Sequence, residues 1–486
     1  MWYFLGGIVL LILGYFTYGK FLERILSPDN RETPAIKNAD GVDYVQLPHW
    51  KNMLIQLLNI AGIGPVIGVI LGIKFGEIVF LLIPIGNILA GATHDFLGGM
   101  MSLRRNGANL PALIRENLGN KVYYAFSIFV SLLLLLVVAV FINIPANLID
   151  GLDGVPCAKH FWIAVVAIFI YYTVATLFPI DKIIGRVYPL FGLMLLVGTF
   201  AIFVAIVWAG FKNPEILTET AVFKSKMWTA ANNHPVLPLL FVTIACGIIS
   251  GFHATQSPII ARSMKHEREA RSSFYGMMIL EGIIAMIWAA AGLAIYNLFP
   301  EQMGIVPAKV LGFITTHFLG KWGGTITVIA VIILAVTSGD TAMRSLRLSF
   351  AEIFKISQKK IISRILLVIP LIVIVTGLLF WSNSDVKSFN NLWNYFAWSN
   401  QVLAACTLFA ATVWLRNNKK PWWIAALPAV FMTFIVATYI LWISPAHGGP
   451  VGFGLDLNMA YYFGAVIALL CLAKIFAESP KDADKE

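Results

Sequence analysis

Charged residues are scarce in this sequence. Asp, Glu, Lys and Arg make up 12% of its 486 residues, whereas an average soluble domain contains about 25%. A soluble fold cannot cover its surface with so little charge, so a water-soluble globular protein is excluded. Hydrophobic residues make up 59% of the chain, and its mean hydropathy is +0.80. The sequence therefore predicts an integral membrane protein.

Cysteine is also scarce, and period-two alternation of apolar and polar residues is missing. The chain has four scattered cysteines without a C-x-x-C pair, so neither a disulfide framework nor a zinc motif is indicated. The apolar segments are continuous, which excludes the alternating strands of a membrane barrel. No sequence pattern indicates a cofactor. The net charge of +10 is interpreted as a record of membrane topology and not as a nucleic-acid surface.

Long apolar runs are what the sequence has instead. Each spanning helix needs about 20 mostly apolar residues, and thirteen such runs can be read. We therefore predict an all-α polytopic protein with these spans: 2–19, 53–73, 78–102, 122–149, 161–178, 187–211, 236–257, 274–298, 323–341, 361–381, 391–415, 421–443 and 457–476.

The basic residues predict the orientation of these spans. If the N-terminus lies outside, 27 of the 35 Lys and Arg residues fall in cytoplasmic segments, as the positive-inside rule requires. The first span lacks a basic n-region and an A-x-A site, so it is predicted to be retained and not cleaved as a signal peptide. The C-terminus is predicted to be cytoplasmic, with a disordered tail over 477–486.

Two spans five apart carry matching interruptions. Span two contains Ala61-Gly-Ile-Gly-Pro65, and span seven contains Gly247-Ile-Ile-Ser-Gly251 before Pro258. Gly and Pro weaken or break a helix at such points. The span after each break leads to a short amphipathic stretch with Pro near its start and Gly at its end, at 109–119 and 306–320. These matches predict an internal duplication.

Because five is odd, the second copy must be inverted in the membrane. Inverted repeats that begin with a broken helix are typical of secondary transporters. The predicted organisation is an N-terminal span and inner loop (1–51), a first repeat (52–211), a second, inverted repeat (236–415), two C-terminal spans (421–476) and a tail (477–486). The inner loop contains Asn38-Ala-Asp-Gly-Val-Asp-Tyr44, a short polar run that could cover an inner gate.

A broken helix exposes free N–H groups on one half and free carbonyls on the other. The N–H end can hold a substrate carboxylate, and the carbonyl end can hold Na⁺ or an ammonium group. The residues that we predict to bind substrate lie at the two breaks: Gly62, Gly64, Pro65, Gly247, Ser250, Gly251, His253, Thr255, Gln256 and Ser257.

Ionisable groups inside spans are costly and often functional. The predicted coupling residues are His94, Asp95, Glu281, Asp340, Ser338 and Thr341. Asp95 and Glu281 occupy similar places in the two copies, and the His94–Asp95 pair is the first choice for proton coupling.

Each of these assignments has an alternative. Asp340 could form an i,i+4 ion pair with Arg344, and Glu281 could be structural. The hydroxyls of Ser338 and Thr341 could complete a Na⁺ site or bond within their own helix. His94, Asp95 and His253 could also hold a metal ion if they converge, although their spacing is not a metal motif. The loop 262–271 has mixed charge and is expected to be solvated beside lipid. Asn394, Asn400 and Gln401 are expected to face the bundle.

The sequence resembles the carbon starvation protein A family of bacterial inner-membrane transporters. The resemblance is carried by Ala39-Asp-Gly-Val-Asp-Tyr44, Ala61-Gly-Ile-Gly-Pro65, Ser102-Leu-Arg-Arg-Asn-Gly-Ala108, Gly251-Phe-His-Ala-Thr-Gln-Ser-Pro-Ile-Ile-Ala-Arg262, Phe274-Tyr-Gly-Met-Met278 with Glu281-Gly282, and Thr337-Ser-Gly-Asp-Thr-Ala-Met-Arg344. It implies the five-plus-five inverted-repeat fold of the amino acid–polyamine–organocation superfamily. It also implies uptake of small peptides or pyruvate, driven by protons, during nutrient limitation.

Together these observations predict a secondary active importer of small carboxylate-bearing nutrients, proton-coupled and working by alternating access. A sodium-coupled symporter is the first alternative. A passive facilitator would need a filter such as a charged ring, and a membrane enzyme would need a clustered nucleophile and base; neither is evident in the sequence. The substrate, the coupling ion and the oligomeric state are left open.

Overall fold

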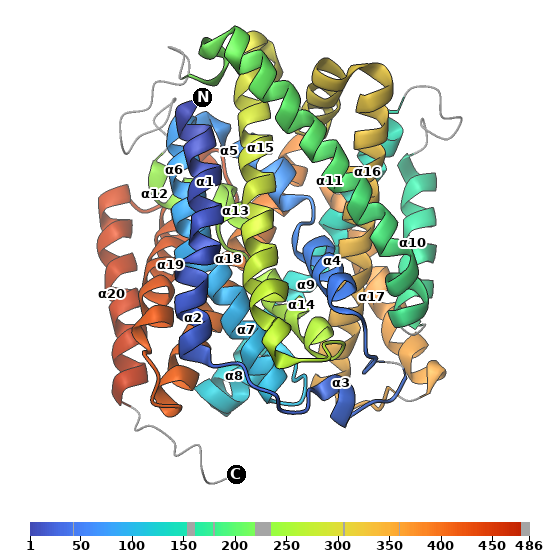
Figure 1. Cartoon of the computed structure of the whole chain (residues 1–486), viewed down its shortest axis with the longest axis vertical. Coiled ribbons are helices and arrows are strands. Elements are labelled where there is room, and N and C mark those ends of the chain that lie inside the picture. Colours follow the sequence, from blue (N-terminus) through green and yellow to red (C-terminus); the bar gives the residue numbers. More distant parts are fainter. Residues whose placement is uncertain are drawn as a thin grey trace.

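The computed structural model describes residues 1–41, 43–152, 161–177, 180–218, 235–304, 307–358 and 360–477, and they are almost entirely helical (Figure 1). The predicted disordered tail, 477–486, lies outside the described residues from position 478 onward. Helix α1 begins at the upper end of the molecule and α20 ends at the lower end (Figure 1). The two termini therefore lie at opposite ends of the molecule, as an odd number of spans requires.

The predicted all-α polytopic fold is confirmed for the described part of the chain. Ten helices in the described part of the chain are long and apolar enough to cross a membrane, and α10 is a shorter apolar helix. The other two spans are the interrupted ones. The main helices are α1 (Trp2–Phe16), α2 (Tyr18–Leu26), α4 (His49–Ile60), α5 (Val69–Gly72), α6 (Val79–Gly86), α7 (Ala92–Arg104), α8 (Leu110–Leu118), α9 (Asn120–Asp150), α10 (Phe161–Leu177), α11 (Ile180–Lys212), α12 (Val236–Thr243), α13 (Ala245–Ile248), α14 (Phe252–Ala261), α15 (Met277–Leu298), α16 (Pro307–Ile353), α17 (Ile361–Ser382), α18 (Val386–Asn417), α19 (Trp423–Trp442) and α20 (Leu457–Ala477).

The two repeats match in backbone detail. In the first, the short helix α8 meets the long helix α9 at Gly119, whose φ is 85° and ψ 171°. In the second, α16 bends at Gly320, whose φ is 71° and ψ 178°. These left-handed angles favour glycine, and they explain why each amphipathic stretch ends in one. The bend divides α16 into an amphipathic part and a span that continues to Ile353, beyond the predicted end at 341.

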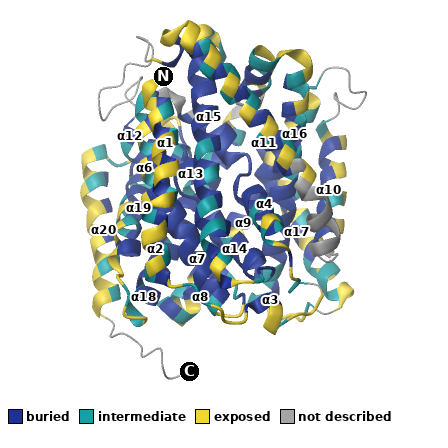
Figure 2. Ribbon diagram, in the orientation of Figure 1, coloured by how far each residue is buried: buried dark blue, intermediate teal, exposed yellow. Residues whose placement is uncertain are grey.

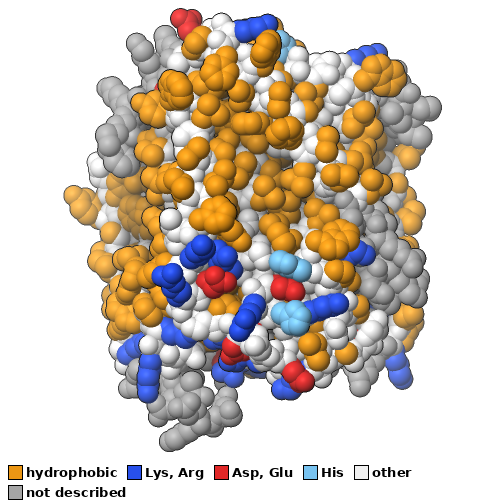
Figure 3. Space-filling model, in the orientation of Figure 1, with side chains coloured by type: hydrophobic (Ala, Val, Ile, Leu, Met, Phe, Trp, Pro, Cys, Tyr) orange, Lys and Arg blue, Asp and Glu red, His pale blue; other side chains and the backbone are white. Residues whose placement is uncertain are grey.

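Burial divides the helices into a core and a lipid-facing layer. Helix α15 is dark blue along most of its length in Figure 2, whereas α20 is largely exposed. The exposed side chains between the two ends are mostly hydrophobic, as Figure 3 shows for one face. Lys and Arg gather towards the lower end of that face, which we call the basic end. An apolar belt with a charged rim is the surface that a bilayer requires.

A segment between α2 and α4 lies across the basic end, and we call residues 27–48 the strap. The Thr33 hydroxyl donates to the Met264 carbonyl at 2.6 Å, and the Leu47 N–H donates to the Ser263 carbonyl at 3.0 Å. Within the predicted gate cover, the Asp43 carboxylate lies 3.6 Å from Arg344. The strap thus ties the loop after α14 and the end of α16 together.

The loop 262–271 differs from the solvated segment that its mixed charge predicts. Glu267 is 1% exposed and pairs with Arg104 at 2.7 Å. Its second oxygen accepts the backbone N–H of Asp29 at 2.9 Å. The carboxylate is buried because the strap and α7 supply its partners, which are more than 160 residues away in sequence.

Replacing Glu267 is therefore expected to destabilise the protein. Removing one partner of a buried ion pair costs about 3–5 kcal/mol, so Glu267→Gln should lower the Tm of the detergent-solubilised protein by several degrees. Glu116→Gln is the matched control. Its ion pair with Arg105 is 34% and 41% exposed, and such pairs contribute about 0–1 kcal/mol. Equal Tm values for the two variants would contradict the role assigned to Glu267.

Candidate functional site

The two broken helices touch at the centre of the core. Helix α4 ends at Ile60, and the chain is irregular over 61–63 before it coils again from Gly64. The second break lies at 249–251, between α13 and α14. A Cβ atom on Gly64 would lie 2.2 Å from the Cys246 sulfur, so only glycine allows this approach. The predicted discontinuities are confirmed, and they face each other.

Asn400 on α18 hydrogen-bonds the backbone and the Ser250 side chain at the second break. Its side-chain oxygen accepts the Phe252 N–H at 2.6 Å, and its amide nitrogen donates to the Ser250 hydroxyl at 2.8 Å. Its carbonyl accepts the Gly251 N–H at 3.2 Å. Next to it, Gln401 donates to the Ile249 carbonyl at 2.9 Å. These bonds replace those that the interrupted helix loses, and they confirm that both amides face the bundle.

The approach of α18 to the break leaves no room at Gly251. A Cβ there would lie 2.3 Å from the Ala404 nitrogen and 2.4 Å from the Asn400 oxygen, both of them backbone atoms. Gly251→Ala should therefore lower the Tm and abolish uptake, because overpacking typically costs about 1–3 kcal/mol. Gly98→Ala is the control, since its nearest neighbour would be the Ala254 Cβ at 3.9 Å. A Gly251→Ala protein as stable as Gly98→Ala would contradict this close packing.

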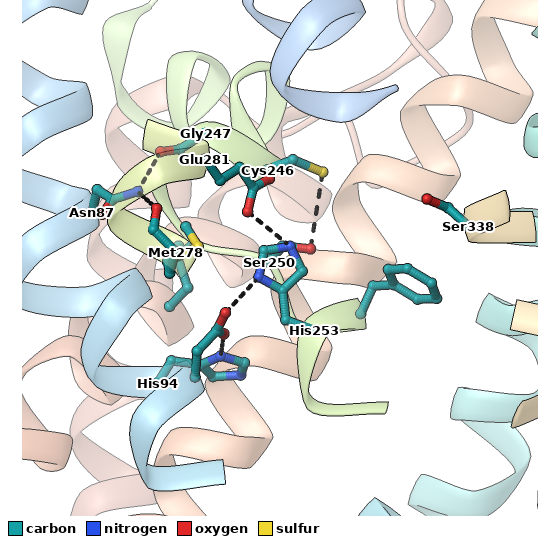
Figure 4. A network of polar contacts seen from close by, with 12 residues as sticks. Asn87, His94, Cys246, Gly247, Ser250, His253, Met278, Glu281 and Ser338 are labelled. Carbon is teal, nitrogen blue, oxygen red and sulfur yellow. Dashed lines mark hydrogen bonds and ion pairs between the residues drawn. The ribbon is translucent and has the colours of Figure 1, made fainter. Parts of the chain in front are cut away.

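Four titratable side chains form a continuous chain beside the breaks (Figure 4). Asp95 on α7 accepts from His94 Nδ1 at 2.8 Å through Oδ1, and from His253 Nδ1 at 2.9 Å through Oδ2. The Nε2 atom of His253 lies 3.5 Å from Glu281 on α15. All four side chains have no exposed surface. His253, from the second broken helix, thus connects the equivalent carboxyls of the two repeats.

Several buried polar atoms on the helices that form or adjoin the breaks have no hydrogen-bond partner among the described residues. Both oxygens of Glu281 and Nε2 of both histidines belong to this set. So do all four amide atoms of Gln56 and Asn59 on α4, and the indole nitrogen of Trp288 on α15. Leaving a buried polar group unpaired costs about 1–3 kcal/mol. A large number of unpaired buried polar groups is therefore typical of a binding site.

Asn87 links the second break to α15. Its amide nitrogen donates to the Gly247 carbonyl at 3.1 Å and to the Met278 carbonyl at 3.0 Å (Figure 4). It lies in the π-helical turn before α7, from which Asp95 projects. The Asn87 side chain therefore fixes Gly247, which lies just before the second break, against the span that carries Glu281.

The three predicted coupling residues of α16, Ser338, Asp340 and Thr341, have different partners. Ser338 donates to the Leu58 carbonyl at 2.8 Å and so reaches the first break. Thr341 donates to the Ser338 carbonyl of its own helix at 2.9 Å. The Asp340 carboxylate accepts from Tyr171 of α10 at 2.6 Å, away from the histidine chain. Of these three residues, Ser338 is the one placed at a break.

Three further predicted residues on α14 connect to other partners. Thr255 and Ser257 donate to the Phe252 and His253 carbonyls of the same helix. Gln256 donates to Thr255 at 2.8 Å and to Ser345 of α16 at 3.4 Å. They lie one turn beyond the break and join α14 to α16.

The structure adds two residues that bond at the second break, Asn87 and Asn400, and three buried polar residues without a partner among the described residues, Gln56, Asn59 and Trp288. Amides in otherwise apolar helices were the available signal, since polar groups inside a bilayer must find partners. His94, Asp95 and His253 do converge. However, no group of three His, Cys, Asp or Glu side chains in the described part of the chain is arranged to hold a metal ion.

Comparison with known proteins gives a consistent family match. The model of the carbon starvation protein CstA family matches residues 1–170, 155–312 and 301–439. The chain is 25% identical over 407 residues to the peptide transporter CstA of Campylobacter jejuni, covering 70% of this chain and 57% of that protein. It is 26% identical over 390 residues to the pyruvate/proton symporter BtsT of Escherichia coli, covering 67% and 53%. The chain thus spans just over half the length of these named transporters.

Solved structures share the fold. The manganese transporter of Eremococcus coleocola aligns with a TM-score of 0.58 at 14% identity, over 90% of this chain and 97% of that one. MhsT in complex with L-phenylalanine aligns with a TM-score of 0.57 at 13% identity, over 89% and 99%. These alignments confirm the predicted transporter fold.

Proposed function

Because the chain belongs to the carbon starvation protein CstA family, a group of multi-pass proteins of the bacterial inner membrane, we propose that it is a secondary active importer of small carboxylates. Pyruvate is the first candidate substrate, and small peptides are the second. The proposal rests above all on one observation: the two broken helices touch, and these helices and the neighbouring α15 carry buried amide, indole and carboxyl groups that have no partner among the described residues. A substrate with oxygen acceptors and a short apolar body would satisfy these groups.

The substrate carboxylate would lie between the breaks. The turn that begins at Gly64 would offer the carboxylate the N–H of Gly64 itself, because Pro65 has no N–H and the N–H groups of Val66 and Ile67 donate to the Ile63 carbonyl. Gln56 and Asn59 are neutral donors on the other half of the same broken helix. Ser250, Gly251 and His253 would contact the substrate from the second break. At Gly62, Pro65 and Gly247, the protein backbone itself would lie close to the substrate.

Proton coupling would use the chain His94–Asp95–His253–Glu281. Its distances of 2.8, 2.9 and 3.5 Å would allow a proton to pass between carboxyls on the two repeats when the repeats move. Asp95 with His94 is the primary coupling pair in this proposal, and Glu281 is the second group. Sodium coupling is the alternative that Ser338 favours, since its hydroxyl meets the Leu58 carbonyl at the first break.

The basic end would face the cytoplasm, with the N-terminus outside and the C-terminus inside. The 27 basic residues in the segments of that side support this orientation. The strap would then cover the cytoplasmic route, with Asp43 and Arg344 as part of the inner gate. Release of substrate into the cell would require these contacts to open.

Reconstitution tests the proposal directly. Purified protein in liposomes should accumulate labelled pyruvate when the outside is made acidic, and a proton ionophore should abolish the accumulation. Parallel samples should contain a labelled dipeptide, or an inward sodium gradient without a proton gradient. Uptake that never exceeds the external concentration would favour a passive facilitator, and conversion of the substrate to a product would favour an enzyme. Accumulation driven by sodium alone would replace protons by sodium as the coupling ion.

A further inference from the structure

A polar cavity lies at the end of the molecule opposite the basic end. Its volume is about 210 Å³. It is bounded by the start of α18, the end of α19, α12 and the turn after α19. Its lining residues include Thr243, Asn390, Trp393, Asn394, Tyr439 and His447. No Asp, Glu, Lys or Arg is among the described residues that line it.

Two buried donors in this lining have no partner among the described residues. The Trp393 side chain is 6% exposed and Tyr439 is 1% exposed, and neither the indole N–H nor the phenol has a hydrogen bond. Thr243 uses its hydroxyl proton on the Leu239 carbonyl at 2.8 Å, so it can only accept. A cavity with unsatisfied donors and neutral amides suits a ligand that is rich in acceptors.

The cavity lies on the path to the central breaks. Trp393 and Asn400 are seven residues apart on α18, which is about 10 Å along the helix axis. Thr243 ends α12, the segment that leads to the second break, and its carbonyl lies 3.0 Å from where a Cβ on Gly68 would be. The cavity therefore touches the second broken span, and its lining residue Thr243 packs against the first.

Aromatic rings connect the cavity to the central site. The rings of Trp393 and Phe396 are 5.5 Å apart, those of Phe396 and Phe141 6.2 Å, and those of Phe141 and Phe252 5.9 Å. Phe252 precedes His253, and Phe141 packs against Gly62. A ligand that contacts Trp393 therefore lies at one end of a row of rings whose other end covers both breaks.

We infer that this cavity is a second binding site, which receives a small carboxylate before it enters the central site. The inference rests on the proposed transport function for its place on the route. The Trp393 N–H, the Tyr439 hydroxyl and the amide of Asn390 would donate to the carboxylate, and Asn394 lines the cavity beside them. The exposed His447 would form the mouth of the cavity. Its ring is held in place because it stacks on Trp442 at 4.8 Å and its Nδ1 bonds the Trp442 carbonyl at 2.9 Å.

Site-specific labelling tests the inference with pyruvate as the probe. Asn394→Cys should react with a membrane-impermeant thiol reagent in proteoliposomes, and pyruvate should protect it. The protein without the added cysteine is the labelling blank. Protection should persist when the partnerless amides of the central site are removed in the variant Gln56→Leu/Asn59→Leu. Protection that disappears in this variant would overturn the inference, because the label would then report only central binding.

Two donor-removing variants refine the test. Trp393→Phe and Tyr439→Phe, each combined with Asn394→Cys, should raise the pyruvate concentration needed for half-protection about tenfold, the change expected for one hydrogen bond to a charged group. Tyr395→Phe is the matched control, since its hydroxyl donates to the Val451 carbonyl at 3.3 Å and it does not line the cavity. Equal half-protection in all three variants would contradict the assigned donors.

The two proposals can fail separately. Protection of Asn394→Cys in a protein that accumulates neither pyruvate nor dipeptide would refute transport and keep the binding site. Accumulation of pyruvate without any protection at saturating concentration would keep transport and refute the second site.

Discussion

Asp95→Asn is expected to abolish the accumulation of pyruvate driven by a pH gradient, while exchange of external for internal pyruvate continues at close to the wild-type rate. The Asp95 carboxylate accepts from His94 at 2.8 Å and from His253 at 2.9 Å. Asn keeps the shape and one acceptor, but it carries no charge and turns an N–H₂ group towards one of the two rings. The protein would then lack its primary proton acceptor and retain its substrate site.

Proteoliposomes separate these two outcomes. Gradient-driven accumulation should fall to the level of liposomes without protein, and counterflow at equal pH should remain. His94→Gln, which keeps the Asp95–His253 pair, should show an intermediate loss. Glu116→Gln, at a partly exposed ion pair, is the control and should accumulate pyruvate normally. If Asp95→Asn loses binding and counterflow as well, Asp95 shapes the substrate site and its coupling role is refuted.

The fold could be predicted from the sequence because its signals are local. Gly and Pro interrupt an apolar run wherever a spanning helix must break, and the left-handed backbone at Gly119 and Gly320 requires glycine between two helices. The basic segments follow a rule of composition. Each of these features needs only a short window of sequence, and each recurs in the second repeat.

The connections of the site could not be predicted in the same way. His253 lies 158 residues from Asp95, and Asn400 lies 148 residues from Phe252. Such pairs depend on how the repeats pack, which periodicity does not encode. Gln56 is ambiguous in the sequence, since an amide at a helix end can face either headgroups or core. Glu267 has the same ambiguity, because a loop of mixed charge usually has a solvated carboxylate.

Glu281→Gln has the second large expected effect, and it distinguishes a proton carrier from a substrate-binding anion. The Glu281 carboxyl is fully buried and lies 3.5 Å from His253, and neither of its oxygens has a hydrogen bond to a described residue. Gln resembles the protonated acid in shape and charge. If Glu281 carries a proton, the variant should exchange pyruvate at a rate that no longer depends on pH, and substrate entry should no longer acidify the vesicle lumen.

The opposite assignment gives a different result. The Glu281 carboxylate, which has no hydrogen bond among the described residues, could instead bind the ammonium group of a dipeptide, an interaction of about 1.5–3 kcal/mol. Glu281→Gln would then weaken dipeptide binding by about 10- to 100-fold and leave the pH dependence of transport unchanged. Measuring pyruvate and dipeptide binding in the same preparation, with a pH-sensitive dye in the lumen, separates the two cases. We expect the first result, because His253 lies between Glu281 and Asp95 and gives a proton a continuous path between the two repeats.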